Sequence, residues 1–403
     1  MTSLRFVGIL VFLLLAFSVQ LKADTVEPIR PKTLGVRVSI LTCSAGEELY
    51  STYGHSAVRV QDSARGTDKV YNYGTFNFSD PDFYWKFTRG KLLYYVAEDN
   101  YQDFMREYIY DKRGVQEQVL DLTGAESVSI RNFLLNNSKE ENKYYHYDFL
   151  FDNCSTRIRD LLQKTLGSEL HFGKVISDDS VSFRTYLNEY ERNLHWERFG
   201  INLLMSDQVD DNMSNEQSFF LPDFLMRGIG LATFHNKPLV KETLQILPAP
   251  FLMHHPPNQP RTIFWILLLV ILVSSFIPSI KRNLIYFDIL FFMLLGLLGC
   301  FMLFMWFGTD HKVCAWNRNL LWAFPLHLVF AVLLSRKSEL ISEYAKYASM
   351  LLGVSVVYSL FAEQEYIKEI TPIILLIFLR LSAYSKRVQL IQSMRGFGMN
   401  TRR

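Results

Sequence analysis

Cys154 is placed where a cysteine can act as a nucleophile. It follows Asp152 and Asn153, two residue types that cap helices, and therefore stands in the first turn of a predicted helix. The unpaired N–H groups and the dipole at a helix start stabilise an anion, which lowers the pKa of a thiol there. The same N–H groups, including that of Cys154, can bind a developing oxyanion. The sequence thus predicts a thiolate that attacks a carbonyl carbon.

His55 is the candidate for the base that such a thiol requires. It follows Gly54 at the start of an alternating strand, where an imidazole can be presented at the edge of a sheet. A cysteine at a helix start that faces a histidine on a sheet is the arrangement of nucleophile and base in papain. Because the histidine precedes the cysteine in this chain, a fold of this kind must be circularly permuted.

Asn72 is the candidate for orienting the imidazole, the third role in such a site. It lies in Lys69–Gly74, the next predicted strand, which would lie beside the strand of His55 if the two form a hairpin. Tyr71 and Tyr73 are the alternatives, on the opposite face of the same strand.

The same residues have plainer explanations. Cys154 could form a disulfide with Cys43, although Cys43 is expected to be a buried strand residue. His146 and His195 are alternative bases, but neither has the strand-edge context of His55. No metal or cofactor is predicted, because the 4 Cys and 9 His show no ligand spacing such as C-x-x-C or H-E-x-x-H.

Two arginines lie about one turn after the candidate nucleophile. Arg157 and Arg159 either hold a phosphate or pair with a neighbouring acid such as Asp160. The sequence does not separate these two roles.

The composition indicates a chain with two unlike parts. Charged residues make up 20% of the 403 positions, below the ~25% of an ordinary soluble domain, while aromatic residues make up 15%. The net charge of +2 argues against a nucleic-acid-binding protein, because such proteins carry a clustered excess of basic residues. The mean hydropathy of +0.07 is too polar for a transporter throughout and too apolar for a soluble enzyme.

We expect five segments along the chain. They are a signal peptide or N-terminal anchor, an external catalytic domain, a proline-rich linker, a transmembrane helical domain and a basic cytoplasmic tail, at residues 1–23, 24–247, 248–261, 262–384 and 385–403. The first segment has the basic start and apolar centre of a secretory signal, which places the following domain outside the cytoplasm.

The transmembrane domain is predicted to contain five helices. Apolar blocks near or somewhat below bilayer length occupy Thr262–Ile280, Leu284–Phe307, Leu320–Leu334, Tyr347–Ala362 and Ile370–Leu381. The positive-inside rule assigns the basic joints between them to the cytoplasm, in agreement with the signal peptide. Asp288 and Arg380 are expected to reach toward the interfaces, whereas His327 is deeper and could bond a neighbouring helix.

The external domain is predicted to be α+β with an antiparallel sheet. Strand-like runs occupy Gly35–Leu41, His55–Val60, Lys69–Tyr73, Leu92–Val96 and Val115–Leu120. Helices are predicted after the capping box of Thr123 and Glu126, and after Asn153.

Several motifs resemble the Lnb family of bacterial membrane proteins. They are Cys43-x-x-Gly46-x-x-x-Tyr50, residues 53–60 (YGHSAVRV), residues 71–76 (YNYGTF), residues 147–157 (YDFLFDNCSTR), residues 219–222 (FFLP) and residues 316–319 (WNRN). The Gly-His-Ser-Ala and Asn-Cys-Ser-Thr-Arg elements are also similar, in this order, to those of lecithin–retinol acyltransferases. The resemblance implies an α+β, circularly permuted papain-like domain of the NlpC and lecithin–retinol acyltransferase type, joined to an all-α transmembrane domain.

The resemblance also implies lipoprotein N-acylation. Such an enzyme moves a fatty acyl chain from the diacylglyceryl group of a lipoprotein, or from a phospholipid, to the α-amine of the lipoprotein's N-terminal cysteine. Cys154 would carry the acyl chain as a thioester and His55 would transfer the protons. The implied partners are lipoprotein substrates and membrane lipids, and the implied place is the bacterial inner membrane, with the catalytic domain on the periplasmic side.

Two other functions fit the same residues. A permuted cysteine peptidase or amidase acting on cell-wall peptides needs the same pair, but in an open polar groove that faces away from the membrane. A non-catalytic membrane receptor or assembly protein predicts Cys154 in a disulfide or far from His55. A pocket mouth at the bilayer surface, lined by Phe76, Phe83 or Trp85, would favour a lipid substrate.

Overall fold

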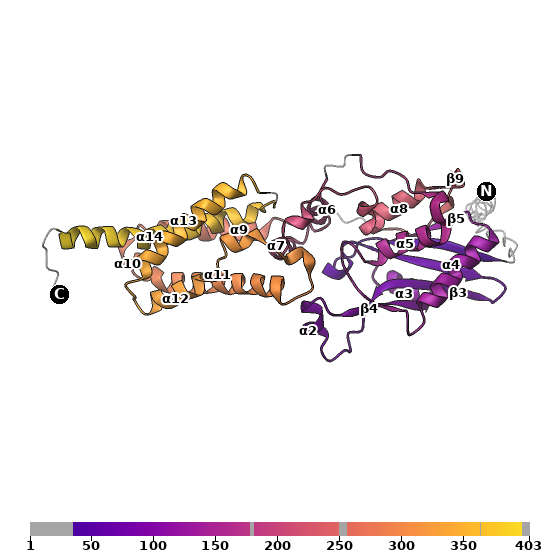
Figure 1. Ribbon diagram of the computed structural model, residues 1–403, viewed down its shortest axis with the longest axis horizontal. Helices are drawn as coiled ribbons and strands as arrows, with labels where there is room; N and C mark the ends of the chain where they lie inside the picture. Colours follow the sequence, from indigo (N-terminus) through magenta and orange to yellow (C-terminus); the bar gives the residue numbers. More distant parts are fainter. Residues whose placement is uncertain (1–34, 178–180, 250–255, 363, 397–403) are drawn as a thin grey trace, which may run out of the picture.

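A computed structural model describes residues 35–177, 181–249, 256–362 and 364–396 of the chain. The described part is elongated, with a sheet and its helices at one end and a group of long helices at the other (Figure 1). The predicted signal peptide at residues 1–23 lies outside the described residues, as do residues 250–255 of the predicted linker and residues 397–403 of the predicted tail.

The N-terminal domain is built on a seven-stranded sheet in the order β10-β5-β1-β2-β3-β4-β6. Its strands are β1 Val36–Cys43, β2 His55–Asp62, β3 Thr67–Thr75, β4 Leu93–Asn100, β5 Val115–Leu120, β6 Tyr144–His146 and β10 Val240–Leu247. All neighbouring strands pair antiparallel. The five predicted strands and the antiparallel sheet are therefore confirmed, whereas β6 and β10 were missed.

Helices cover both faces of this sheet. One core contains the buried side chains of Val58, Tyr71 and Ile158, and it joins the sheet to α4 Gly124–Asn137, α5 Cys154–Leu166 and α8 Pro222–Gly230. The opposite face packs on α3 Tyr101–Tyr110 through Phe104, Met105 and Tyr108. The capping box of Thr123 and Glu126 is present at the start of α4, as predicted.

Shorter elements complete the N-terminal domain. They are α2 Phe83–Thr88, α6 Phe183–Tyr190, α7 His195–Leu204 and a small sheet of β7 Leu170–His171, β8 Thr233–Phe234 and β9 Lys237–Pro238. Of these, α2 and α7 lie on the side of the domain that faces the long helices (Figure 1).

The C-terminal region is helical, as predicted. Its helices are α9 Gln259–Ser274, α10 Pro278–Lys281, α11 Leu284–Phe307, α12 His327–Ser335, α13 Ile341–Ser359 and α14 Thr371–Gly396. In the described part of the chain, α11 alone is long and apolar enough to cross a bilayer by itself, and α9 is a shorter apolar helix. The predicted block Leu320–Leu334 is helical only from His327, because a 3-10 turn (Arg318–Leu321) and Pro325 precede it.

Asp288 and Arg380 do not reach toward the interfaces, so that expectation was wrong. Both are buried, and the Arg380 guanidinium donates from Nε and Nη2 to the two carboxylate oxygens of Asp288 at 2.7 and 2.8 Å. Arg380 also donates to Ser275 Oγ at 3.0 Å, and Tyr384 donates its hydroxyl to Asp288. Because each charge is satisfied inside the protein, neither needs water, and the network ties α9, α11 and α14 together.

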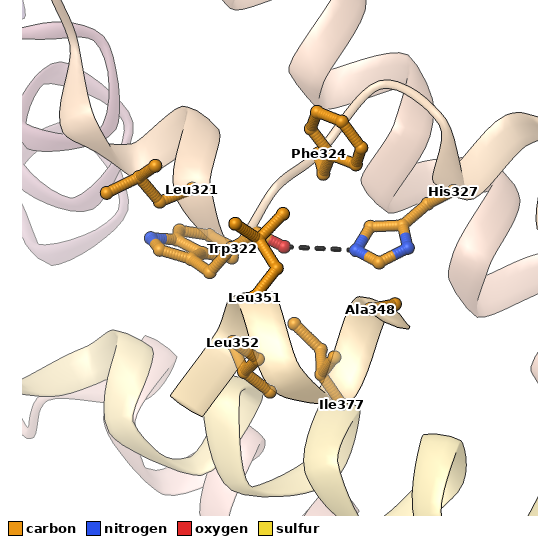
Figure 2. A pocket seen from close by; sticks show the side chains of 8 residues that line it. All are labelled: Leu321, Trp322, Phe324, His327, Ala348, Leu351, Leu352 and Ile377. Carbon is orange, nitrogen blue, oxygen red and sulfur yellow. Dashed lines mark hydrogen bonds between the residues drawn. The ribbon is translucent and has the colours of Figure 1, made fainter. Parts of the chain in front are cut away.

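His327 bonds a neighbouring helix, as the sequence suggested. Its Nε2 lies 3.1 Å from the carbonyl oxygen of Trp322 (Figure 2), and its Nδ1 lies 2.9 Å from the hydroxyl of Tyr344 on α13. The apolar cavity beside it, walled by Trp322, Leu352 and other side chains in the figure, measures about 10 Å³. That volume is about one water molecule, so this cavity does not hold an acyl chain.

Polar contacts fix the N-terminal domain against the ends of the helices. Arg198 of α7 forms an ion pair with Glu369 at 2.7 Å, and Asn317 donates to the carbonyl oxygen of Leu203 at 2.7 Å. Arg318 forms a further ion pair with Asp207. Since residues 316–319 belong to the loop between α11 and α12, this loop holds the two parts of the chain together.

Candidate active site

The start of β2 sets the position of His55. In the β1–β2 ladder His55 lies opposite Cys43, at the end of the sheet from which β10 leads to the helical region. Gly54 has φ +82°, and a Cβ on it would lie 2.6 Å from the carbonyl oxygen of Cys43. A glycine is therefore required before His55, both for the backbone conformation and for space.

The start of α5 sets the position of Cys154. Asn153 caps this helix, and its Oδ1 accepts from the N–H groups of Ser155 and Thr156 at 2.9 and 3.0 Å. Its Nδ2 donates to the carbonyl oxygens of Phe149 and Phe220, both at 2.8 Å, which fastens the helix start to the surrounding loops. The sequence predicted free N–H groups in the first turn of α5. The Asn153 side chain binds two of these groups, and the N–H of Cys154 is the one that it does not bind.

Gly74 lets β3 approach Cys154, the candidate nucleophile. It has φ +89° and lies where the pairing of β3 with β4 is irregular, between Asn72 and Thr75. A Cβ on Gly74 would lie 3.9 Å from the Cβ of Cys154 and 3.5 Å from the ring of Tyr147. The irregular strand thus brings Asn72 and the thiol to the same end of the sheet.

Cys154 and His55 lie close enough for the charge of each to shift the pKa of the other. Burial alone would raise the pKa of the Cys154 thiol, which is only 8% exposed. The His55 imidazolium, the N–H of Ser56 and the Ser155 hydroxyl outweigh burial, and the pKa of Cys154 falls below its ordinary value. Burial opposes the charge on His55 as well, but the Cys154 thiolate and Asn72 raise the pKa of its imidazole. Both shifts favour a thiolate–imidazolium pair.

Asn72 and Asp99 fix the orientation of the imidazole. His55 Nε2 lies 3.2 Å from Asn72 Oδ1, and Asn72 Nδ2 donates to Asp99 Oδ2 at 2.7 Å. Because a carboxylate only accepts, Asp99 must receive the amide N–H, which turns the amide oxygen toward Nε2. The proton on Nε2 is thereby fixed, and Nδ1 is the nitrogen left for the thiol.

Asp99 was missed by the sequence analysis. It lies on β4 with its partner Val70 opposite, and only the pairing of β3 with β4 brings it to Asn72. The available signal was the acidic end of the strand after Leu92–Val96, which the sequence alone does not connect to residue 72. Tyr71 and Tyr73, the alternatives to Asn72, are buried in the core under α5, and Tyr73 donates to Asn137 at 2.7 Å.

The structure does not bring the other candidates to the nucleophile. His146 is exposed on β6, and His195 Nε2 lies 2.9 Å from the carbonyl oxygen of Pro256. Cys43 is buried, and both Cys43 and Cys154 are free thiols, so the disulfide alternative was wrong. Among the residues that the structure describes, no group of His, Cys, Asp and Glu could hold a metal ion.

The two arginines after the nucleophile pair with neighbouring acids. Arg157 donates to both carboxylate oxygens of Asp152 at 2.6 and 2.8 Å. Arg159 pairs with Asp160 at 2.8 Å, one of the two roles that the sequence left open.

An open hollow of about 450 Å³ lies elsewhere on the domain. It is lined by residues that include Gln116, Gln118, Lys174 and Arg227, and it contains neither Cys154 nor His55. A cell-wall peptidase needs a polar groove around the reactive thiol. This hollow does not provide one, because it does not include Cys154.

Family comparisons agree with this division of the chain. Residues 32–188, which include His55 and Cys154, match the model of the Lnb N-terminal periplasmic domain. Residues 254–389 match the model of the Lnb transmembrane domain. The protein is thus a membrane protein with a periplasmic domain. No curated protein and no solved structure matches the chain.

Replacing His55 with Ala should make Cys154 less reactive at neutral pH. Without the imidazolium, burial dominates and the pKa of the thiol rises, so the thiolate fraction at pH 7 falls and alkylation slows by ~10-fold or more. In the parent protein, alkylation should remain fast below the usual thiol pKa of ~8.5. The measurement is the iodoacetamide rate at Cys154 against pH, followed by peptide mass spectrometry. His146→Ala is the control, and equal pH profiles for parent and His55→Ala would contradict the ion pair.

Replacing Asp99 with Ala should weaken the same pair from a distance. The Asn72 amide is then free to turn, so the acceptor for His55 Nε2–H is lost and alkylation of Cys154 at pH 7 slows by roughly 10-fold. Asp99→Asn keeps an acceptor and should restore most of the rate, whereas Glu98→Ala serves as the neighbouring control. If Asp99→Ala keeps the parent's pH profile, Asp99 has no positioning role.

Proposed function

The chain belongs to the Lnb family, and we propose that it is a membrane-bound thiol acyltransferase that acts on lipoproteins. It would move a fatty acyl chain from the diacylglyceryl group of a lipoprotein, or from a phospholipid, to the α-amine of the lipoprotein's N-terminal cysteine. The observation that carries this proposal is the neighbouring Cys154–His55 pair, in which Asn72 orients the imidazole and the shifted pKa values favour a thiolate beside an imidazolium.

In the first half of the reaction the Cys154 thiolate attacks the ester carbonyl carbon. The oxyanion of the tetrahedral intermediate forms beside the start of α5, where the N–H of Cys154 is available to bind it. His55 then gives its Nδ1 proton to the departing glyceryl oxygen, the carbon–oxygen bond breaks, and an acyl thioester remains on Cys154. The imidazole is left neutral, with its Nε2 proton still held by Asn72.

In the second half the α-amine of the lipoprotein attacks the thioester. Neutral His55 accepts the amine proton at Nδ1, the carbon–sulfur bond breaks, and the amide product leaves. The thiolate–imidazolium pair is thereby restored, so the cycle needs no metal, nucleotide or redox cofactor. Burial of Cys154 also protects the thioester, because it limits the access of water that would hydrolyse the intermediate.

The arrangement of the chain suits a substrate that is anchored in lipid. Cys43 pairs with both His55 and Val115, and Val115 pairs with Leu247, the last residue of β10, from which the chain continues to the helical region. Ion pairs such as Arg198–Glu369 hold the N-terminal domain against the helical region. An ester near the membrane surface would therefore meet the thiol without leaving its bilayer.

The alternative of a non-catalytic receptor or assembly protein has less support. That alternative requires Cys154 in a disulfide or His55 far from it, whereas His55 lies near enough to shift the pKa of Cys154 and both cysteines of the domain are free.

Replacing Cys154 with Ala or Ser should abolish lipoprotein N-acylation. Removal of a catalytic nucleophile lowers turnover by ~1000-fold or more in enzymes that act through such groups. The test is mass spectrometry of lipoprotein N-termini from cells that contain this chain as their sole N-acylating enzyme. Cys300→Ala, in the lipid-facing surface of α11, is the matched control. Unchanged acylation in Cys154→Ala would refute the proposed function.

A further inference from the structure

The segment of residues 76–94, called the aromatic finger here, exposes several large apolar side chains. It contains α2, and it leaves Phe78, Tyr84, Trp85 and Phe87 more than half exposed. A water-facing surface rarely gathers so many rings, and such patches mark contacts with membranes or other proteins.

The finger is fastened to the outer end of membrane helix α11 (Figure 1). The ring of Trp85 stacks on Phe304 with centroids 6.1 Å apart, and Arg89 Nε donates to the carbonyl oxygen of Gly308 at 3.2 Å. A second bond joins the two segments through the backbone, in which the N–H of Asp310 donates to the carbonyl oxygen of Arg89 at 2.9 Å. These bonds fix the height of the finger relative to the helix.

That height is the boundary between lipid and water. With 24 residues α11 is ~36 Å long, slightly more than the ~30 Å hydrocarbon core of a bilayer, so its last turn lies at the surface. Trp306 stands in this turn and packs against both Phe307 and Trp316 with ring centroids 4.6 Å apart. Such aromatic residues gather at membrane interfaces, and Trp85 lies in the same belt.

A chain of ring contacts leads from the finger to the nucleophile. Phe83 contacts Phe76 at 5.7 Å between centroids, Phe76 contacts Tyr94 at 5.3 Å, and Tyr94 stacks on Tyr147 at 4.4 Å. Tyr147 in turn lies beside Gly74, because a Cβ on Gly74 would lie 3.5 Å from the Tyr147 ring. The same Cβ would lie 3.9 Å from the Cβ of Cys154. The described rings therefore form a continuous series of contacts from the finger to Tyr147, and Tyr147 and Cys154 both border Gly74.

We propose that the aromatic finger inserts into the periplasmic leaflet and that its rings guide an acyl chain of that leaflet to Cys154. The insertion follows from the exposed rings and from their attachment to α11, whereas the guiding role rests on the proposed acyl transfer. The occupant is a lipid acyl chain with its ester at the surface, because aromatic rings line the path and, among the described residues, the ion pair on the finger is Lys86–Asp80, whose side chains are partly exposed.

The first test measures insertion without using activity. A Phe87→Cys variant in a full-length Cys154→Ala, Cys300→Ala background carries a polarity-sensitive fluorophore, in vesicles of phosphatidylethanolamine and phosphatidylglycerol. Brominated phospholipid should quench this probe strongly, and should not quench the same probe at Leu231→Cys, an exposed position beyond α8. Equal and weak quenching at both positions would overturn the insertion.

The second test measures guidance. A Trp85→Gln, Phe87→Gln variant should N-acylate a lipoprotein in the same vesicles at least ~10-fold more slowly, since two apolar contacts with lipid are lost. Its iodoacetamide rate at Cys154 should equal that of the parent, which separates guidance from damage to the site. Leu231→Gln is the matched control. Parental acylation by the finger variant would overturn guidance, whereas parental acylation by Cys154→Ala would instead overturn the proposed function.

Discussion

The site depends on one buried interaction, the contact of the Cys154 thiol with the His55 imidazole. Burial opposes both charges, because each leaves water, so the pair exists only if the partners around it compensate. The N–H of Ser56 and the Ser155 hydroxyl stabilise the thiolate, and Asn72 stabilises the imidazolium. These partners come from β2, α5 and β3, so the sheet and its first covering helix must fold together before the thiol becomes reactive. The glycines at 54 and 74 serve the same end, since each lets the backbone adopt a conformation that a side chain would block.

The second constraint is the position of this pair relative to the bilayer. A soluble thiol enzyme must draw an acyl ester out of lipid, which exposes the acyl chain to water at a cost of ~0.8 kcal/mol for each CH₂ group. Here the ion pairs Arg198–Glu369 and Arg318–Asp207 and the bond from Asn317 to Leu203 join the N-terminal domain to the helical region. The helices are in turn fixed to one another by the buried Asp288–Arg380 pair. The charged groups within the helical region thus support the geometry of the proposed reaction, which would take place outside it.

Much of this site was predictable from local patterns. A capping sequence before Cys154, a glycine before His55 and the alternation of the following strand placed the thiol, the base and Asn72 at one end of a sheet, and the structure brings these three side chains together. Asp99 and the contact of Trp85 with Phe304 were not predictable, because they depend on strand pairing and on packing between distant segments. The snorkelling of Asp288 and Arg380 was predicted wrongly for the same reason, since single-chain hydropathy does not reveal that an acid on one helix faces a base on another. β10 was missed because its exposed and half-buried residues alternate without a strongly apolar side.

The most direct test of the account is the detection of an acyl group on Cys154 itself. The purified full chain in vesicles would be mixed with a lipoprotein that carries isotopically labelled acyl chains and whose N-terminal amine is blocked, and then quenched in acid and digested. The account predicts that the peptide containing Cys154 gains the mass of one labelled acyl chain, and that neutral hydroxylamine removes this chain as expected for a thioester. A labelled donor that is consumed while Cys154 stays unmodified, or an acyl group found on another residue, would contradict it.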